Sequence, residues 1–114
     1  MSQLRTIRCV GCEGGIPPLT REDITQLLPQ LHHEWKVSTD EKSIHRRFMF
    51  QNFYHTMAFV NAVAWIANQE NHHPDMEVGY NYCAITYTTH AVKGLTQNDF
   101  ICAAKVDSLE ASTP

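Results

Sequence analysis

The chain has 114 residues, with nine Lys and Arg against twelve Asp and Glu, and a formal net charge of −3. Its content of 43% hydrophobic and 18% charged residues predicts one globular domain and argues against wholesale disorder. No block of basic residues stands out, so we expect no nucleic-acid binding through a basic face. The most apolar window, residues 57–67, is too short to span a membrane and contains Asn61.

The cysteines and the N-terminus bear on the cellular compartment. The first residues, MSQLR, lack the apolar segment of a secretory signal, so we expect a cytoplasmic protein whose four cysteines are reduced thiols. Cys9 and Cys12 form a C-x2-C pair, whereas Cys83 and Cys102 occur singly. Because structural zinc sites usually take four ligands, this half motif does not predict a metal site.

Glycines and prolines divide the chain into two parts. Residues 1–18 are rich in both and are predicted to be an irregular N-terminal arm, followed by a single domain over residues 19–111. Thr20, with Asp23 three residues later, forms an acidic variant of the capping box and predicts the start of a helix. Ile24 and later leucines continue the apolar stripe of that helix.

Alternation and helical spacing then predict four strands and two more helices. The strands fall at residues 34–38, 43–50, 77–80 and 82–90, the first two forming a hairpin. The central helix begins after Asn52 and ends before Pro74, and its predicted apolar stripe is Phe53, Met57, Val60, Ala64 and Ala67. A last helix follows Thr96 and buries Phe100, Ala103, Ala104 and Val106. The order αββαββα predicts an α+β fold: a four-stranded antiparallel sheet with helices packed on one face.

Three histidines are the strongest candidates for chemistry. His72 and His73 are adjacent at the end of the central helix, and His90 closes the last strand, an end that can lie beside the loop leaving that helix. Three neutral imidazoles can hold a catalytic zinc ion, although adjacent residues direct their side chains apart. Imidazoles can equally transfer protons, because they titrate near neutrality. The remaining interpretation is a polar helix end without chemistry.

Several segments resemble the pterin-4a-carbinolamine dehydratase family. They are ENHHPD at residues 70–75, YN at 80–81, ITYTTH at 85–90, GLT at 94–96 and Asp99. The spacing between the histidine doublet and the Thr-His pair agrees with that family without a gap. Trp35, the junction at residues 50–53 and the arm from Cys9 to Thr20 also resemble it, and this arm is typical of bacterial members. The resemblance covers nearly the whole chain.

The resemblance implies an activity. Family members dehydrate 4a-hydroxytetrahydrobiopterin to quinonoid dihydropterin and water, which recycles the cofactor of aromatic amino acid hydroxylases, and they use no metal or organic cofactor. By this resemblance His72, His73 and His90 are the catalytic residues. We expect His72 and His90 to interact with the 4a-hydroxyl group while His73 accepts the proton from a ring nitrogen.

The resemblance also implies a set of substrate-binding residues: Trp35, Glu70, Pro74, Thr89 and Asp99. Pro74 is expected to fix the loop of the doublet. Trp35 is either an apolar wall of the pterin site or a core residue. Asp99 is either a site residue or a plain helix cap, and its position three residues after Thr96 favours the cap.

Family members form dimers or tetramers, so we expect a homodimer or homotetramer with residues 43–50 or the central helix at the contact. Animal relatives also act as a dimerisation cofactor for a homeodomain transcription factor. A coactivator-type binding protein is therefore an alternative function, although the bacterial-type arm argues against it. A metal-dependent hydrolase built on the three histidines is the other alternative.

Overall fold

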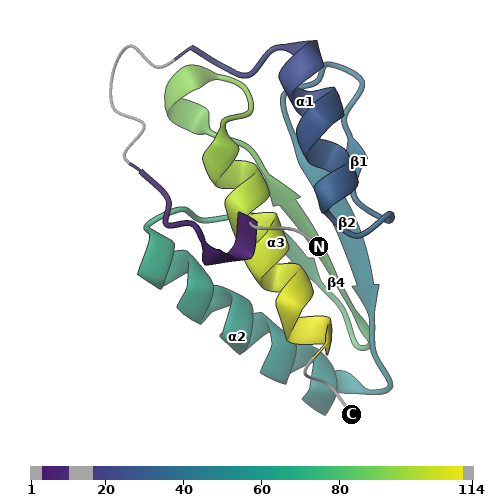
Figure 1. Ribbon diagram of the computed structural model, residues 1–114. Coiled ribbons are helices and arrows are strands. Elements are labelled where there is room, and N and C mark those ends of the chain that lie inside the picture. Colours follow the sequence, from purple (N-terminus) through teal and green to yellow (C-terminus); the bar gives the residue numbers. More distant parts are fainter. Residues whose placement is uncertain (1–3, 11–16, 112–114) are drawn as a thin grey trace.

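The computed structural model describes residues 4–10 and 17–111, and it shows an antiparallel sheet covered on one face by helices (Figure 1). The strands are β1 (Lys36–Val37), β2 (Ile44–Met49), β3 (Asp75–Val78) and β4 (Tyr82–Tyr87). The helices are α1 (Arg21–Leu27), α2 (Phe53–Glu70) and α3 (Gln97–Ala111), with short 3-10 helices at Leu4–Thr6, Leu28–Gln30 and His90–Val92. The strand order β1-β2-β4-β3, antiparallel throughout, confirms the predicted α+β fold.

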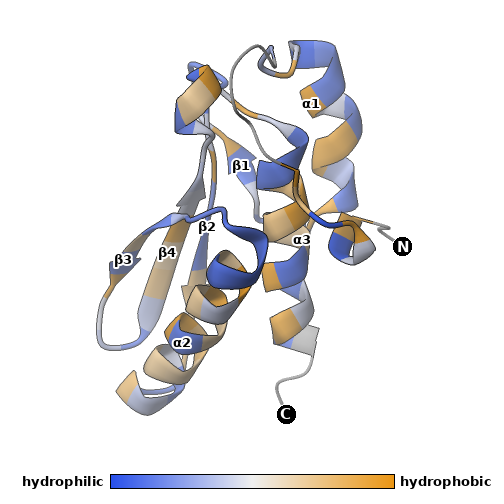
Figure 2. Cartoon of the chain, turned by 90° about the vertical axis from the view of Figure 1, so that its left-hand side faces the viewer, coloured by the Kyte–Doolittle hydropathy of each residue, from blue (hydrophilic) through white to orange (hydrophobic). Residues whose placement is uncertain are grey.

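Alternation along the two central strands defines the face that the helices cover. Ile44, Arg46 and Phe48 of β2 are buried, as are Cys83, Ile85 and Tyr87 of β4. Figure 2 shows α2 and α3 on the same side of this sheet. The predicted buried face of α3 is confirmed, since Phe100, Ala103, Ala104 and Val106 are all buried.

The start of α1 follows its sequence signal. The Thr20 hydroxyl accepts a hydrogen bond from the Asp23 N–H at 3.2 Å, and the Asp23 carboxylate accepts one from the Thr20 N–H at 3.1 Å. Both halves of the predicted capping box are therefore formed. Such a cap satisfies two backbone donors that a helix start otherwise leaves unpaired.

The predicted apolar stripe of α2 is wrong for most of its members. The buried residues are Thr56, Phe59, Val63, Ile66 and Ala67, so of the predicted stripe only Ala67 is buried. The helix carries apolar residues around most of its circumference, and spacing alone therefore does not select the face that packs on the sheet. Tyr54 and Trp65 are left 80% and 64% exposed.

The predicted end of α2 is also corrected. The helix stops at Glu70, before Pro74, because Asn71 adopts the left-handed conformation with φ of 52°. The His72 N–H then donates to the Ala67 carbonyl at 3.1 Å, as expected where a left-handed residue closes a helix. The histidine doublet consequently lies in a loop, and its side chains are not bound to helical spacing.

Replacing Asn71 should test how this turn is stabilised. Asn71→Ala is expected to lower the free energy of unfolding by about 1 kcal/mol relative to Asn71→Gly, because a Cβ without a local polar group is disfavoured in the left-handed region. Urea unfolding of the two variants measures the difference. Equal stability of the two would mean that the left-handed turn does not limit the end of α2.

The ordered part of the arm packs on the rest of the chain. Leu4 is buried in the core, and Cys9 is partly buried against it. Cys9, Cys83 and Cys102 are free thiols, whereas Cys12 falls outside the described residues. Within the described ranges, no helix is long and apolar enough to cross a membrane.

Candidate functional site

A cavity of about 420 Å³ opens where the loop after α2 meets the end of β4. His72, His73 and His90 all line it, so the structure brings together the three imidazoles that lie far apart in sequence. Its other lining residues are Cys9, Val10, Glu70, Asn71, Thr88, Thr89, Ala91 and Asn98. Most of this lining is polar or backbone surface, which suits a ligand with many hydrogen-bonding groups.

Sheet register explains the convergence. Asp75, the first residue of β3, pairs with Thr86 near the end of β4. The residues before Asp75 and those after Thr86 therefore leave the sheet at the same end. The left-handed turn at Asn71 sets the doublet at this end of the sheet.

The His72 ring is held by a buried carboxylate. Its Nε2 lies 2.6 Å from Asp99 Oδ1, and Asp99 is fully buried. The ring also stacks nearly parallel on Tyr87, with 5.9 Å between centroids. If Nε2 carries the proton donated to Asp99, then Nδ1 is the nitrogen that can exchange a proton, and the carboxylate fixes the orientation of the ring.

Asp99 serves as helix cap and histidine partner at the same time. Its Oδ2 accepts from the Thr96 N–H at 3.0 Å and from the Thr89 hydroxyl at 2.8 Å, while Oδ1 faces His72. The two threonine hydroxyls are themselves 2.8 Å apart. The alternatives of cap and site residue are thus not exclusive, because each carboxylate oxygen has its own partners.

His73 and His90 have a different environment from His72. Both are exposed, and His90 is the first residue of the 3-10 helix that follows β4. One imidazole is therefore anchored and mostly buried, while two stand in contact with water. Proton transfer to and from a ligand can use such an arrangement, because the anchored ring fixes the geometry and the exposed rings can exchange protons with water.

Glu70 lies in the cavity wall with both oxygens occupied. Oε1 accepts from the Cys9 N–H at 2.8 Å, and Oε2 forms ion pairs with Arg8 and Lys105. Burial works to raise the pKa of Glu70, but the Cys9 hydrogen bond and the charges of Lys105 and Arg8 outweigh it and hold the pKa below its ordinary value. Glu70 is therefore an ionised residue that is bound by its own chain.

Three of the predicted substrate-binding residues do not line the cavity: Trp35, Pro74 and Asp99, which reaches it through His72. Trp35 is 1% exposed, and its Nε1 donates to Asp107 Oδ1 at 2.7 Å. It is connected to the site through Tyr87, whose ring lies 6.2 Å from that of Trp35 and stacks on His72. Pro74 is half-buried and links His73 to β3. Thr89, in contrast, lines the cavity.

Six lining residues were not among the predicted site residues: Cys9, Val10, Asn71, Thr88, Ala91 and Asn98. Asn98 occupies the first turn of α3, where it reads as an ordinary polar residue, and Cys9 and Val10 belong to the arm. Their positions depend on contacts across about the full length of the chain. Among the described residues, His, Cys, Asp and Glu side chains bring three potential metal ligands together at His32, His33 and Glu34; the cavity histidines form no such group.

The fold and the cavity together define a class: small α+β proteins with a histidine-lined pocket at one end of an antiparallel sheet. Residues 17–109 match the family model described as pterin 4 alpha carbinolamine dehydratase. The chain belongs to this family.

Curated relatives span nearly the same length. A sequence from Legionella pneumophila (strain Corby), provisionally named a pterin-4-alpha-carbinolamine dehydratase, is 60% identical over 108 residues, covering 95% of this chain and 96% of its own. A second from Nitrosomonas eutropha, with the same provisional name, is 59% identical over 102 residues, covering 90% and 88%.

Two solved structures share the fold. One is a transcriptional coactivator/pterin dehydratase from Brucella melitensis, with a TM-score of 0.76 and 28% identity, covering 81% of this chain and 97% of that one. The other is a pterin dehydratase-like protein described as a RuBisCO assembly factor in the alpha-carboxysome. Its TM-score is 0.61 at 28% identity, covering 72% and 95%.

Proposed function

We propose that this protein is a hydro-lyase that dehydrates 4a-hydroxytetrahydrobiopterin to quinonoid dihydropterin and water. The observation that carries the proposal is the convergence of His72, His73 and His90 on one cavity, with His72 anchored by a buried carboxylate. Family membership supplies the pterin as the substrate class. The reaction needs a proton delivered to the departing hydroxyl group and another removed from a ring nitrogen, which are steps that positioned imidazoles accelerate.

The environments of the histidines suggest a division of roles. Asp99 orients the His72 ring toward the cavity through a short hydrogen bond, so His72 suits the donor that protonates the 4a-hydroxyl group, with His90 beside it. His73 is exposed and has no carboxylate partner among the described residues, which suits the acceptor of the ring proton. After each turnover, water can restore the protonation states through the exposed rings.

The remaining residues of the site act on binding and position. Thr89 and Asp99 form the hydrogen-bonded floor beneath His72. Pro74 restricts the backbone that follows His73, and Trp35 supports Tyr87 from within the core. We propose Glu70 as part of the wall that faces the substrate.

A direct test follows the decay of freshly generated 4a-hydroxytetrahydropterin by stopped-flow absorbance. The proposal expects faster decay with the protein than with buffer, and the same acceleration after dialysis against a chelator. An unchanged decay rate would refute dehydration. A metal-dependent hydrolase is the alternative that loss of activity on chelation would favour, although the cavity histidines do not form a three-ligand group in this structure.

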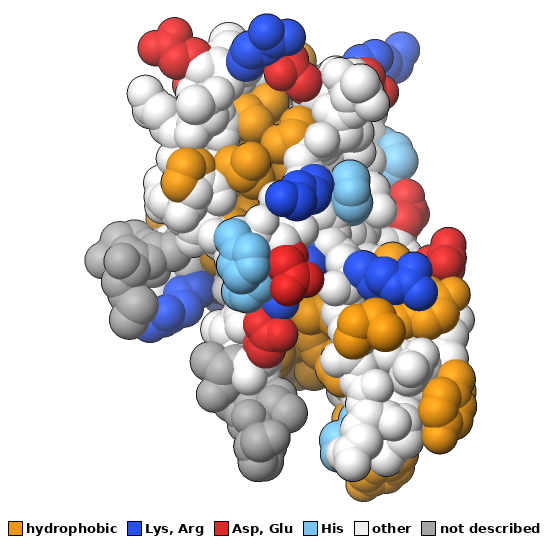
Figure 3. All heavy atoms as spheres, turned by 90° about the vertical axis from the view of Figure 1, so that its right-hand side faces the viewer, with side chains coloured by type: hydrophobic (Ala, Val, Ile, Leu, Met, Phe, Trp, Pro, Cys, Tyr) orange, Lys and Arg blue, Asp and Glu red, His pale blue; other side chains and the backbone are white. Residues whose placement is uncertain are grey.

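A second candidate function is protein binding, which the similarity to the Brucella transcriptional coactivator/pterin dehydratase favours. Several large apolar side chains are exposed around the start of α2 and the neighbouring strand ends: Met49, Phe53, Tyr54, Val78 and Tyr80. Figure 3 shows such side chains gathered in the lower part of one face. Patches of this kind mark interaction surfaces, so a pull-down with the pterin site blocked by ligand would detect a partner independent of dehydration.

We propose that the same surfaces form a homodimer or homotetramer, through β2 or α2. Light scattering on the purified protein measures the number of chains, and a monomer at all concentrations would contradict the proposal. We further propose a cytoplasmic enzyme that serves an aromatic amino acid hydroxylase, because the carbinolamine is the product that such a hydroxylase leaves.

A further inference from the structure

We propose that Cys9 and Val10 of the N-terminal arm form one wall of the catalytic cavity, and that Asn98 and Glu70 are positioning residues that hold this wall in place. The proposal rests on the proposed function, because it assigns the arm a part in binding the pterin. Cys9 and Val10 line the same cavity as the three histidines.

Asn98 binds the arm with both ends of its amide. The Val10 N–H donates to Asn98 Oδ1 at 3.1 Å, and Asn98 Nδ2 donates to the Val10 carbonyl at 2.6 Å. The Asn98 side chain thus forms the same pair of hydrogen bonds with the Val10 backbone that a residue of a neighbouring β-strand would form. Asn98 is 4% exposed, and a buried amide that loses its partners carries a desolvation cost, so this pair favours the docked arm.

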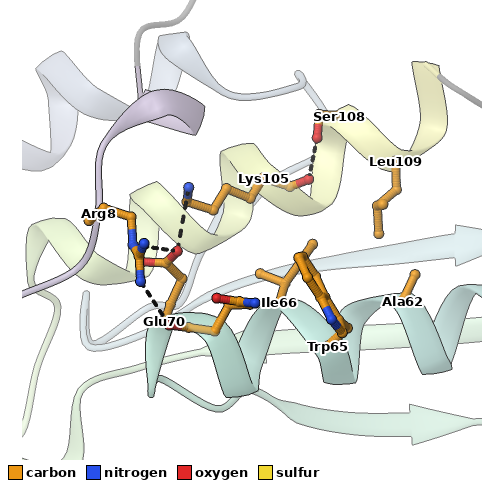
Figure 4. A pocket seen from close by; sticks show the side chains of 9 residues that line it. Arg8, Ala62, Trp65, Ile66, Glu70, Lys105, Ser108 and Leu109 are labelled. Atoms are coloured by element: carbon orange, nitrogen blue, oxygen red, sulfur yellow. Dashed lines mark hydrogen bonds and ion pairs between the residues drawn. The ribbon is translucent and has the colours of Figure 1, made fainter.

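Glu70 binds the preceding two residues. Its Oε1 accepts from the Cys9 N–H, and its Oε2 lies 3.3 Å from Arg8 Nε and 3.5 Å from Lys105 Nζ. Figure 4 shows the arm crossing the end of α2 with Arg8 and Lys105 converging on this carboxylate. The Arg8 guanidinium also donates to the Gln69 carbonyl at 3.2 Å. The residue that ends α2 before the doublet therefore also fixes the arm.

A buried thiol contact completes the docking. Cys9 Sγ lies 3.5 Å from Cys102 Sγ and 3.8 Å from the Asn98 carbonyl, so the side chain packs into α3. Further along, Lys105 Nζ donates to the Arg5 carbonyl at 2.9 Å, and Leu4 is buried in the core. The contacts run continuously from the core to the cavity and give the arm a defined position.

The catalytic groups do not depend on the arm for their own geometry. His72 is oriented by Asp99 and Tyr87, and His90 by the end of β4. Displacing the arm should therefore remove one wall and weaken ligand binding, while the chemical step on bound substrate continues. In kinetic terms KM should rise and kcat should change little.

The test uses the full chain with Asn98→Ala, and Gln97→Ala as the matched control, since Gln97 is exposed in the same turn of α3. In a Cys12→Ser background, the reaction rate of Cys9 with a disulfide reagent reports arm docking. For Asn98→Ala we expect that rate, KM for the carbinolamine, and Kd for 7,8-dihydrobiopterin each to rise about tenfold, the effect of losing roughly 1.4 kcal/mol of hydrogen bonding. We expect kcat to stay within about twofold, and Gln97→Ala to match the wild type.

Val10→Pro provides a second route to the same test, since it deletes the N–H donor from an exposed residue. Faster Cys9 labelling with unchanged KM and Kd would contradict the proposal that the arm forms a wall of the cavity. Unchanged Cys9 labelling in both variants would contradict the proposal that Asn98 holds the arm in place. Failure of the proposed function gives a different result, namely no acceleration by the wild type, while labelling and pterin Kd still decide on the arm.

Discussion

Replacing His72 with alanine is expected to lower kcat for carbinolamine dehydration by about 10²–10⁴, the usual contribution of one positioned proton-transfer group. His72 is expected to show the largest loss of the three, because among the described residues it is the histidine of the cavity that a buried carboxylate holds, at 2.6 Å from Asp99. Substrate affinity should fall less than turnover, since the lost interaction develops with the proton transfer itself. Stopped-flow turnover of fresh carbinolamine measures both parameters.

His73→Ala and His90→Ala are expected to reduce kcat in the same direction, while His45→Ala serves as control because His45 is exposed on β2 and does not line the cavity. Urea unfolding of each variant shows that the fold is retained. Near wild-type turnover in all three cavity variants would rule out histidine acid–base catalysis here. Asp99→Asn separates orientation from chemistry, because an amide can still accept from the Thr96 N–H but no longer places a negative charge beside the His72 ring.

The fold was predictable where local signals agree. The capping box at Thr20 and the alternation along residues 44–49 and 82–87 each depend on residues close in sequence. The buried face of α2 and the residue that ends it could not be predicted, for two different reasons. Its apolar residues surround the helix, so tertiary packing selects the buried face. Asn71 precedes Pro74 in the chain, and its left-handed conformation ends the helix before the proline can do so.

The candidate site shows the same division. The three histidines and the Thr-His pair are recognisable from their spacing, and the antiparallel order of β3 and β4 predicts that they meet. The two simultaneous functions of Asp99 could not be predicted, because the sequence pattern offered helix capping and a site function as alternatives. The docking of Val10 on Asn98 joins residues 88 positions apart, and no local pattern encodes such a pair. Sequence reasoning therefore finds the reactive groups more readily than the wall around them.

An ion-pair cluster around the buried Arg46 side chain carries the largest expected effect on stability. Arg46 is 3% exposed, and its Nη1 donates to Asp107 Oδ1 at 2.7 Å while Nη2 donates to Glu110 at 2.8 Å. Its guanidinium also lies 4.1 Å from the centroid of the Phe48 ring. Asp107 in turn accepts from Trp35 Nε1 at 2.7 Å. The cluster thus ties β2 and the residue before β1 to the last turns of α3.

Arg46→Ala is expected to lower the free energy of unfolding by about 3–5 kcal/mol, because it leaves the Asp107 carboxylate without its cation and opens a cavity beside Phe48. Arg47→Ala is the matched control: its side chain lies on the exposed face of the same strand, over the Tyr82 ring, and its loss should cost about 1 kcal/mol or less. Arg46→Met keeps most of the packing and removes the charge, so the difference between the two Arg46 variants separates the unpaired carboxylate from the cavity. Urea unfolding measures all three. If Arg46→Ala cost no more than Arg47→Ala, the cluster would contribute no net stability, and the attachment of α3 to the sheet would depend on apolar packing alone.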